Sequence, residues 1–249
     1  MSIEYMPVSR QGSGSFDGGK IEEHKPIPFP HEGGGFEPFS TLFYWAHAWS
    51  VPGGLIDLHP HKGFEIISYV LKGSIEHYDT ILAKWLPLHA GCLQIIRSGS
   101  GVEHAERILP GSAIFQIWFD PGLAQSLGNP ASYDDYRPGD FGVSNSNGMK
   151  ITSLVGKNSP VRMDAPAEMK KADLLPGNHE IGWNNPYDSL ICMISGSAIQ
   201  AGQKILPGDV LKVTGESKLA IQAEEATELF IVAVPQKAPY ATYVDSFAR

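Results

Sequence analysis

Three histidines and a carboxylate stand at spacings that suit a metal site. His59 and His61 are one residue apart, and His104 and Glu106 repeat that spacing further along the chain. Residues i and i+2 of a β-strand point to the same face, so each pair can present two ligand groups together. Imidazoles with a carboxylate are typical ligands of divalent transition metals such as iron, manganese, zinc and copper. The pattern predicts one metal centre if the two segments meet.

A histidine pair alone is weak evidence. A solvated loop, or core histidines that are hydrogen-bonded, would give the same sequence. The second pair strengthens the metal hypothesis because it lies in RSGSGVEHAER, residues 97–107, where Gly99 and Gly101 allow a tight turn before the ligands.

Two further residues share the parity of the first pair. Glu65 would lie on the face of His59 and His61 if no bulge intervenes, so it is a second candidate carboxylate. His77 has the same parity, and it suits a pocket-lining role and a structural role equally well.

The surrounding segments are typical of strands. Apolar runs rich in β-formers occupy residues 40–50, 64–73, 91–99 and 113–122, and Gly and Pro are spread along the chain between such runs. Short runs separated by frequent turns predict an all-β protein. The polar segment 123–148 is the best candidate linker, with room for a short helix near its start.

The second half of the chain repeats the order of the first. LICMISGSAIQ, residues 190–200, resembles ISYVLKGSIEH, residues 67–77, with an apolar strand, a Gly-Ser turn and a second strand. Such a repeat favours two similar β-barrel domains, which we expect at residues 1–140 and 141–249. The second copy has only His179 near the matching position, so we expect the metal in the first domain and none in the second.

Composition narrows the function classes. The net charge of -8 and the absence of a Lys/Arg stripe argue against direct nucleic-acid binding. No apolar run approaches 18 residues and the N-terminus lacks a signal-peptide pattern, so we expect neither a membrane span nor secretion. Cys92 and Cys192 are far apart with apolar neighbours, which suggests buried free thiols in a reducing compartment and hence a cytoplasmic protein.

The motifs resemble those of a known family. PGGLIDLHPHKGFE is similar to the first cupin motif. HPHKGFEIISYVLKGSIEHYD, SGSGVEHAE and FQIWFDP resemble the pirin family more closely, whereas the first forty residues show little of the usual pirin pattern. The resemblance implies two tandem cupin-type (jelly-roll) β-barrels with few short helices, of which the N-terminal barrel binds iron.

The same resemblance implies roles for the candidate residues. His59, His61, His104 and Glu106 match the pirin metal ligands, with Fe(II) the expected ion and Zn, Mn, Ni or Cu as alternatives. A generic cupin would take its carboxylate from Glu65 instead. With Glu106 as the ligand, Glu65 would orient a ligand histidine.

Two functions follow from the resemblance. Some pirins are similar to quercetin 2,3-dioxygenases, which implies an enzyme that uses molecular oxygen and a flavonol or another small aromatic or enol substrate, with Glu106 as the catalytic base. The alternative is a regulator that is not an enzyme, in which the redox state of iron controls binding to a protein partner. A cupin scaffold that has lost its metal is a third option.

Overall fold

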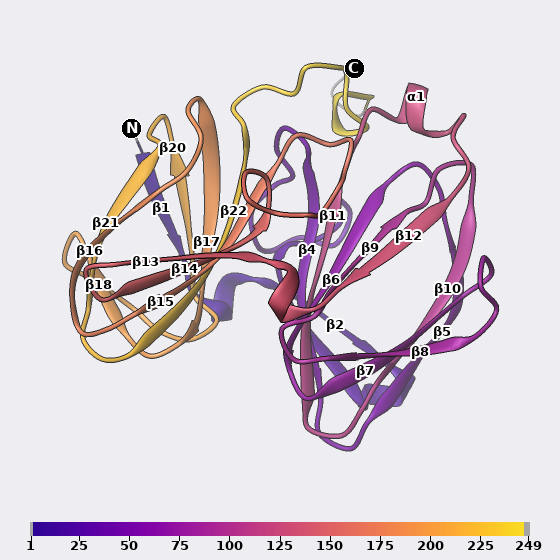
Figure 1. Cartoon of the computed structure of the whole chain (residues 1–249), viewed down its shortest axis with the longest axis horizontal. Coiled ribbons are helices and arrows are strands. Elements are labelled where there is room, and N and C mark those ends of the chain that lie inside the picture. The colour runs from indigo at the N-terminus through magenta and orange to yellow at the C-terminus, as the bar shows by residue number, and fades with distance from the viewer. Residues whose placement is uncertain (1, 247–249) are drawn as a thin grey trace. The chain divides into compact units, whose positions relative to one another are not determined.

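The computed structural model describes residues 2–246, which fold into two compact units (Figure 1). We call residues 11–139, 163–165 and 239–246 the N-terminal unit, and residues 2–10, 140–162 and 166–238 the C-terminal unit. The predicted all-β class is confirmed. The helices among the described residues are α1 (Leu123–Ser126) and the 3₁₀ turns η1 (Val8–Arg10), η2 (Asp17–Gly19), η3 (Pro138–Asp140) and η4 (Val244–Ser246).

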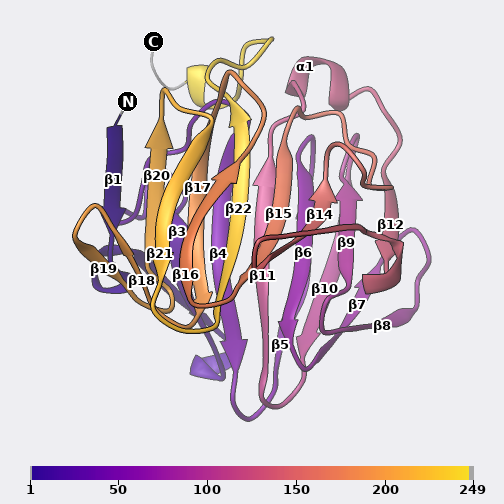
Figure 2. The same cartoon turned by 60° about the vertical axis from the view of Figure 1, so that its left-hand side comes forward.

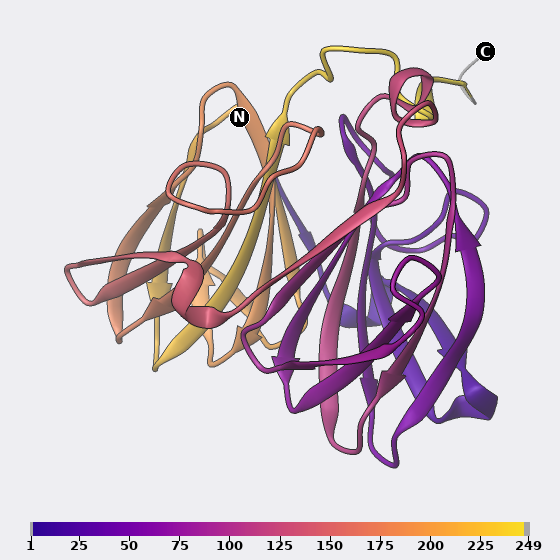
Figure 3. The ribbon, with the colours of Figure 1, turned by 45° about the vertical axis from the view of Figure 1, so that its right-hand side comes forward.

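The N-terminal unit consists of two antiparallel sheets, whose strands run from indigo through magenta to rose in Figure 3. The larger sheet has the order β12 (Ser132–Tyr136), β9 (Leu93–Arg97), β6 (Glu65–Lys72), β11 (Ser112–Phe119), β4 (Leu42–Ser50), β3 (Ile21–Ile27) and β2 (Gly12–Phe16). The smaller sheet has the order β5 (Gly54–His61), β10 (Val102–Ile108), β7 (Ser74–Asp79) and β8 (Trp85–His89).

Apolar side chains from both sheets form the core of this unit. Val70 and Ile114 from the larger sheet cluster with Ile75 and Ile108 from the smaller one, and all four are essentially inaccessible to solvent. Burial of each such side chain stabilises the fold by about 1.5–3 kcal/mol relative to leaving it exposed. The two sheets are therefore held face to face, and the inward side chains of both can meet.

The C-terminal unit has the same arrangement of strands (Figure 2). Its larger sheet runs β1 (Ser2–Met6), β20 (Val210–Thr214), β17 (Tyr187–Ser195), β22 (Thr227–Pro235), β15 (Glu168–Leu174), β14 (Met149–Val155) and β13 (Gly142–Ser146). Its smaller sheet runs β16 (Gly177–Gly182), β21 (Lys218–Ala223), β18 (Ala198–Gln200) and β19 (Gln203–Ile205). Strand for strand, the two units repeat one topology, in which β17 corresponds to β6 and β22 to β11.

The units differ from the division at residues 140 and 141 that the sequence suggested. That division placed Ser2–Met6 in the first domain, whereas β1 pairs with β20, with Ser2 opposite Thr214 and Met6 opposite Val210. The C-terminal unit gains its edge strand in this way. In return residues 239–246 belong to the N-terminal unit, and Figures 1 and 3 show them beside α1.

No helix in the described part of the chain is both long enough and apolar enough to cross a membrane.

Candidate metal centre

Neighbouring strands of the smaller sheet carry the predicted ligand pairs. His59 and His61 end β5, and His104 and Glu106 lie on β10, which pairs with β5 so that His104 is opposite His59. The register shifts between His104 and Glu106, which then faces His77 on β7. The alternation of side chains along each strand and the pairing of β5 with β10 therefore bring the H-x-H segment next to the H-x-E segment.

The imidazole nitrogens converge on one point. Nε2 of His104 lies 2.8 Å from Nε2 of His61 and 3.0 Å from Nε2 of His59. Nδ1 of His59 donates a hydrogen bond to the carbonyl oxygen of Asp57 at 2.7 Å, which leaves its Nε2 lone pair directed at the cluster. One N–H on His104 cannot satisfy both neighbouring nitrogens. A divalent cation would satisfy all three lone pairs, so the donor set fits a metal.

Burial keeps two of these histidines neutral. Desolvation, followed by the charge of His59, lowers the pKa of His61 to about 3. Desolvation also lowers the pKa of His104 well below its usual value, with the neighbouring histidines adding to the effect. Metal ligands must be deprotonated imidazoles, so both side chains can bind a metal at neutral pH without first losing a proton.

Glu106 is fully buried beside the histidines and is hydrogen-bonded. Its Oε1 accepts from the hydroxyl group of Ser68 at 3.0 Å, and its Oε2 accepts from the amide of Gln116 at 2.7 Å. Its carboxylate, a nitrogen of His77 and a nitrogen of His104 all lie within 4.8 Å of one another. The structure thus places Glu106 next to the cluster, with both oxygens oriented by the larger sheet.

His77 also belongs to this buried group. Its Nε2 donates to Oδ2 of Asp79 at 3.1 Å, while Oδ1 of Asp79 accepts from the backbone N–H groups of Ile81 and Leu82 at 2.8 Å. The ring of His77 lies 5.4 Å from that of His104. Sequence reasoning missed Asp79, although its spacing of two residues from His77 on a strand was a usable signal.

Glu65 lies elsewhere, contrary to the parity argument. Its two oxygens accept hydrogen bonds from the backbone N–H groups of Asp164 and Ala165 at 2.8 and 2.9 Å, and it lines a different cavity from the histidines. The chain leaves the smaller sheet after His61 and enters the larger one at Glu65, so strand parity does not carry across. Burial raises the pKa of Glu65 to about 7.

His59, His61 and Glu106 line a cavity of about 450 Å³ with an aromatic wall. Phe29 stacks on Tyr44 with ring centroids 4.4 Å apart, and Trp118 meets the edge of Phe29 at 5.2 Å and that of His61 at 4.7 Å. Glu23 and Gln116 also line the cavity. Sequence reasoning missed both, because they belong to strands of the opposite sheet.

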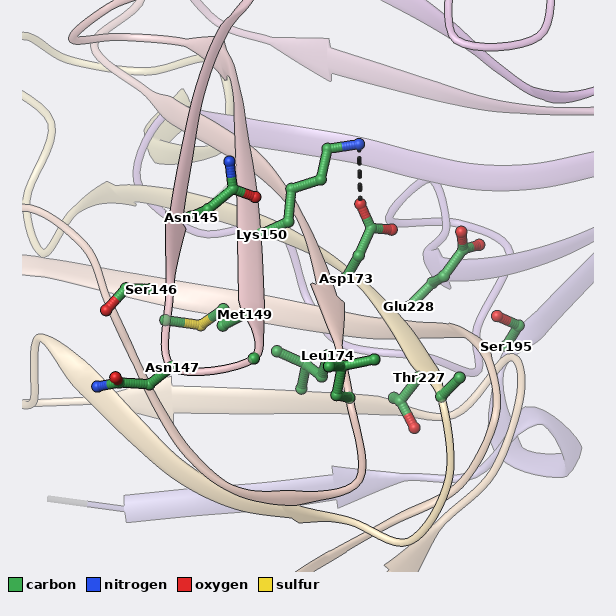
Figure 4. Close-up of a pocket in the computed structure, with 13 residues that line it drawn as sticks. Asn145, Ser146, Asn147, Met149, Lys150, Asp173, Leu174, Ser195, Thr227 and Glu228 are labelled. Atoms are coloured by element: carbon green, nitrogen blue, oxygen red, sulfur yellow. Dashed lines mark ion pairs between the residues drawn. The ribbon is translucent and has the colours of Figure 1, made fainter.

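A larger cavity of about 640 Å³ lies in the C-terminal unit, at the turn between β13 and β14 (Figure 4). Its charged groups are already paired: Lys150 is 3.6 Å from Asp173, and Lys171 bridges Asp173 and Glu228. His179, the histidine nearest to a ligand position in this unit, donates to the carbonyl oxygen of Leu175 at 2.7 Å. The candidate centre is therefore the histidine cluster of the N-terminal unit.

Comparisons with known proteins agree with this location. The sequence model of the Pirin family matches residues 29–119, which include all four predicted ligands. The chain is 27% identical over 184 residues to a quercetin 2,3-dioxygenase from Escherichia coli, covering 71% of this chain and 75% of that protein. It is 30% identical over 135 residues to Pirin-like protein 2 from Arabidopsis thaliana, covering 51% of this chain and 40% of that protein.

The chain spans less than half the length of some relatives that it matches. It covers 29% of a Pasteurella multocida protein and 40% of the Arabidopsis thaliana protein. Among solved structures, the fold is similar to that of the bacterial pirin YhhW from Escherichia coli in complex with nickel(II). The TM-score is 0.76 at 22% identity, and the match covers 94% of this chain and 99% of the other.

Proposed function

Since the Pirin family model matches residues 29–119 of this chain, we propose that the protein is a metal-dependent dioxygenase of the quercetin type, acting on a flavonol or a related small enol or phenol. The convergence of three imidazole nitrogens at the edge of an aromatic cavity carries this proposal. The name of the Escherichia coli relative supports the choice of substrate class. The predicted ligands are His59, His61, His104 and Glu106.

The cavity suits a flat, hydroxylated molecule. Phe29, Tyr44 and Trp118 offer ring faces and edges against which an aromatic substrate can pack. The carboxylate of Glu106 is available in the same cavity to accept the proton of a substrate hydroxyl group. Ser68 and Gln116 hold that carboxylate in place, and Trp118 in turn donates to the amide oxygen of Gln116 at 3.3 Å.

We propose Fe(II) as the ion, one per chain, bound in the N-terminal unit. When bound, a redox-active metal would hold the oxygen atoms of the substrate and accept electron density, which prepares the substrate for molecular oxygen. Purified protein can also carry zinc, copper or nickel in such a site, because these ions bind N and O ligands more tightly than Fe(II) in the Irving–Williams order. Manganese, which binds more weakly than iron in that order, is a further alternative. The two buried free cysteines fit the reducing conditions of the cytoplasm, where we propose the protein acts.

Elemental analysis of protein prepared without a metal-affinity tag tests the centre. We expect close to one metal ion per chain after anaerobic iron loading, and little in His104→Ala, because His104 is the ligand that touches both other imidazoles. Little metal in the parent protein after loading would refute the proposed centre and leave a scaffold function.

Oxygen uptake tests the activity. We expect uptake when a flavonol is added to the iron-loaded protein and none with His59→Ala. Absence of uptake across a panel of enols and phenols, together with partner binding that depends on the iron valence, would support the regulator instead.

A further inference from the structure

A second carboxylate lies in the cavity of the metal centre, on a strand of the opposite sheet. Glu23 on β3 is 5% exposed and lines the same cavity as His59, His61 and Glu106. Burial of this kind is rare for a glutamate unless it is paired or functional. Glu23 and Glu106 therefore present two carboxylates to one cavity.

Pairing leaves one oxygen of Glu23 without a hydrogen bond. Nζ of Lys25 lies 3.5 Å from Oε2 of Glu23 but only 2.5 Å from Oε1 of Glu32, which it contacts by a hydrogen bond. Oε2 of Glu23 is buried and has no hydrogen-bond partner in the described part of the chain. This oxygen is enclosed by Gly14 and Lys25, so it is not the atom that a ligand would reach. Because Glu23 lines the cavity, a ligand hydroxyl group that donates to the rest of the carboxylate would add a hydrogen bond there.

The backbone makes room for this arrangement. Gly14 on β2 pairs with Glu23, and a Cβ atom at Gly14 would lie 2.8 Å from Oε2 of Glu23 and 3.0 Å from Nζ of Lys25. A glycine at this position therefore lets the charged side chains lie against the strand. The lining residues that carry a formal charge are acidic, and the nearby Lys25 is paired with both Glu23 and Glu32.

We propose that Glu23 determines specificity by accepting a hydrogen bond, at its carboxylate, from a substrate hydroxyl group other than those bound at the metal centre. The ligand class is a neutral aromatic molecule with hydroxyl groups at both ends. A molecule with a carboxylate in place of the second hydroxyl group is disfavoured, because it would offer an acceptor and a negative charge to an acidic wall. This inference rests on the proposed function in assuming that a small molecule enters the cavity.

The test measures binding rather than turnover. Protein loaded with zinc, which is redox-inert, is titrated in a calorimeter with 3-hydroxyflavone and with a flavonol that carries additional hydroxyl groups on both ring systems. We expect the parent to bind the hydroxylated flavonol at least about tenfold more tightly. Glu23→Leu should abolish that preference, and Glu23→Gln should retain part of it because its amide oxygen still accepts a hydrogen bond.

Glu22→Gln is the matched control, because Glu22 is the exposed neighbour of Glu23 on β3 and should leave the preference unchanged. Zinc content and melting temperature report whether each variant is folded. A second measurement needs no variant: the parent should bind the hydroxylated flavonol at least about tenfold more tightly than an analogue bearing a carboxylate.

Three outcomes would overturn the assignment: a parent that shows no preference, a parent that binds none of these ligands, or a Glu23→Leu variant that keeps the preference. The proposed function is judged separately, by oxygen uptake of the iron-loaded parent and its loss in His59→Ala. An active parent without the preference would therefore refute the role of Glu23 alone.

Discussion

The two candidate carboxylates, Glu106 and Glu65, occupy different environments and should differ in their effect on metal binding. Glu106 lies beside the histidines, whereas both oxygens of Glu65 are occupied by backbone N–H groups of residues 164 and 165. We predict that Glu106→Ala loses most of the bound metal and that Glu65→Ala loses much less, as measured by elemental analysis. The reverse order would assign the ligand role to Glu65.

Asp79 should position the centre through His77. Asp79 accepts the hydrogen bond that fixes the ring of His77, and that ring lies beside the ring of His104. Without this acceptor, the ring of His77 would no longer be held in place. Loss of a group that orients metal ligands typically costs 10–100-fold in metal affinity. We predict a loss of about tenfold for Asp79→Asn in a competition titration with a chelator. The control is Glu76→Gln, because Glu76 lies on the same strand but pairs with Arg107 rather than with the histidines. A lower melting temperature with unchanged affinity would show that Asp79 is only structural.

Glu65 should make stability depend on pH. Its pKa is raised by burial to about 7 in the folded protein, above the ordinary value of 4.5. Between these values the unfolded chain releases the proton and the folded protein keeps it, so the stabilising contribution is full below pH 4.5 and is lost as pH rises through 7. We predict that the free energy of unfolding of the parent falls by up to about 3 kcal/mol relative to Glu65→Gln across this range. Parallel curves for the two proteins, measured by chemical denaturation, would contradict the assignment.

The turn before β10 illustrates how an element positions the proposed ligands His104 and Glu106. Gly99 has a φ of +46°, and a Cβ atom there would lie 2.4 Å from the backbone oxygen of Asn129. Gly111 has a φ of +71° with open space around it, so an alanine there would meet no steric clash. Gly111→Ala therefore measures only the cost of holding a non-glycine residue in the left-handed conformation, which is about 1–2 kcal/mol. We predict that Gly99→Ala destabilises the protein more than Gly111→Ala, and that only Gly99→Ala lowers metal content. Equal losses in both would show that the turn does not position His104.

Local pattern predicted the strands that carry the proposed ligands, and it failed where the chain changes sheets. The alternation in H-x-H and H-x-E is a property of single strands, so His59, His61 and His104 could be found from sequence. Glu65 was misplaced because the chain crosses from one sheet to the other after His61. Glu23 and Gln116 reach the cavity only because two sheets stack, and no local spacing records that contact.

At the scale of the whole molecule, the two units exchange the ends of the chain. In the shared topology β1 takes the edge position that β12 takes in the N-terminal unit. Yet β1 is far in sequence from its partner strand β20, since Ser2 and Thr214 are 212 positions apart. The internal repeat predicted two similar barrels. A boundary drawn through the middle of the chain could not reveal which barrel receives the N-terminus, because strand pairing at that separation leaves no local signal.

Removal of residues 2–6 tests this exchange. Tyr5 donates a hydrogen bond to the buried Asp209 at 2.9 Å, and Ile3 and Tyr5 pack on the core of the C-terminal unit. The deletion exposes the edge of β20 and part of that core. We therefore predict that calorimetry shows a lower melting temperature for the C-terminal unit, with metal content near that of the parent.

Asp120→Ala is the matched change at the other end. The carboxylate of Asp120 accepts from the backbone of Tyr243 at 2.6 Å, and its carbonyl oxygen accepts from the hydroxyl group of Tyr240 at 2.7 Å. Loss of that carboxylate should destabilise the N-terminal unit and reduce metal content instead. The opposite result would be a metal centre emptied by the deletion of residues 2–6 and left filled by Asp120→Ala. The stability of each unit would then follow position along the chain rather than strand pairing, and the exchange of chain ends between the units would have no energetic role.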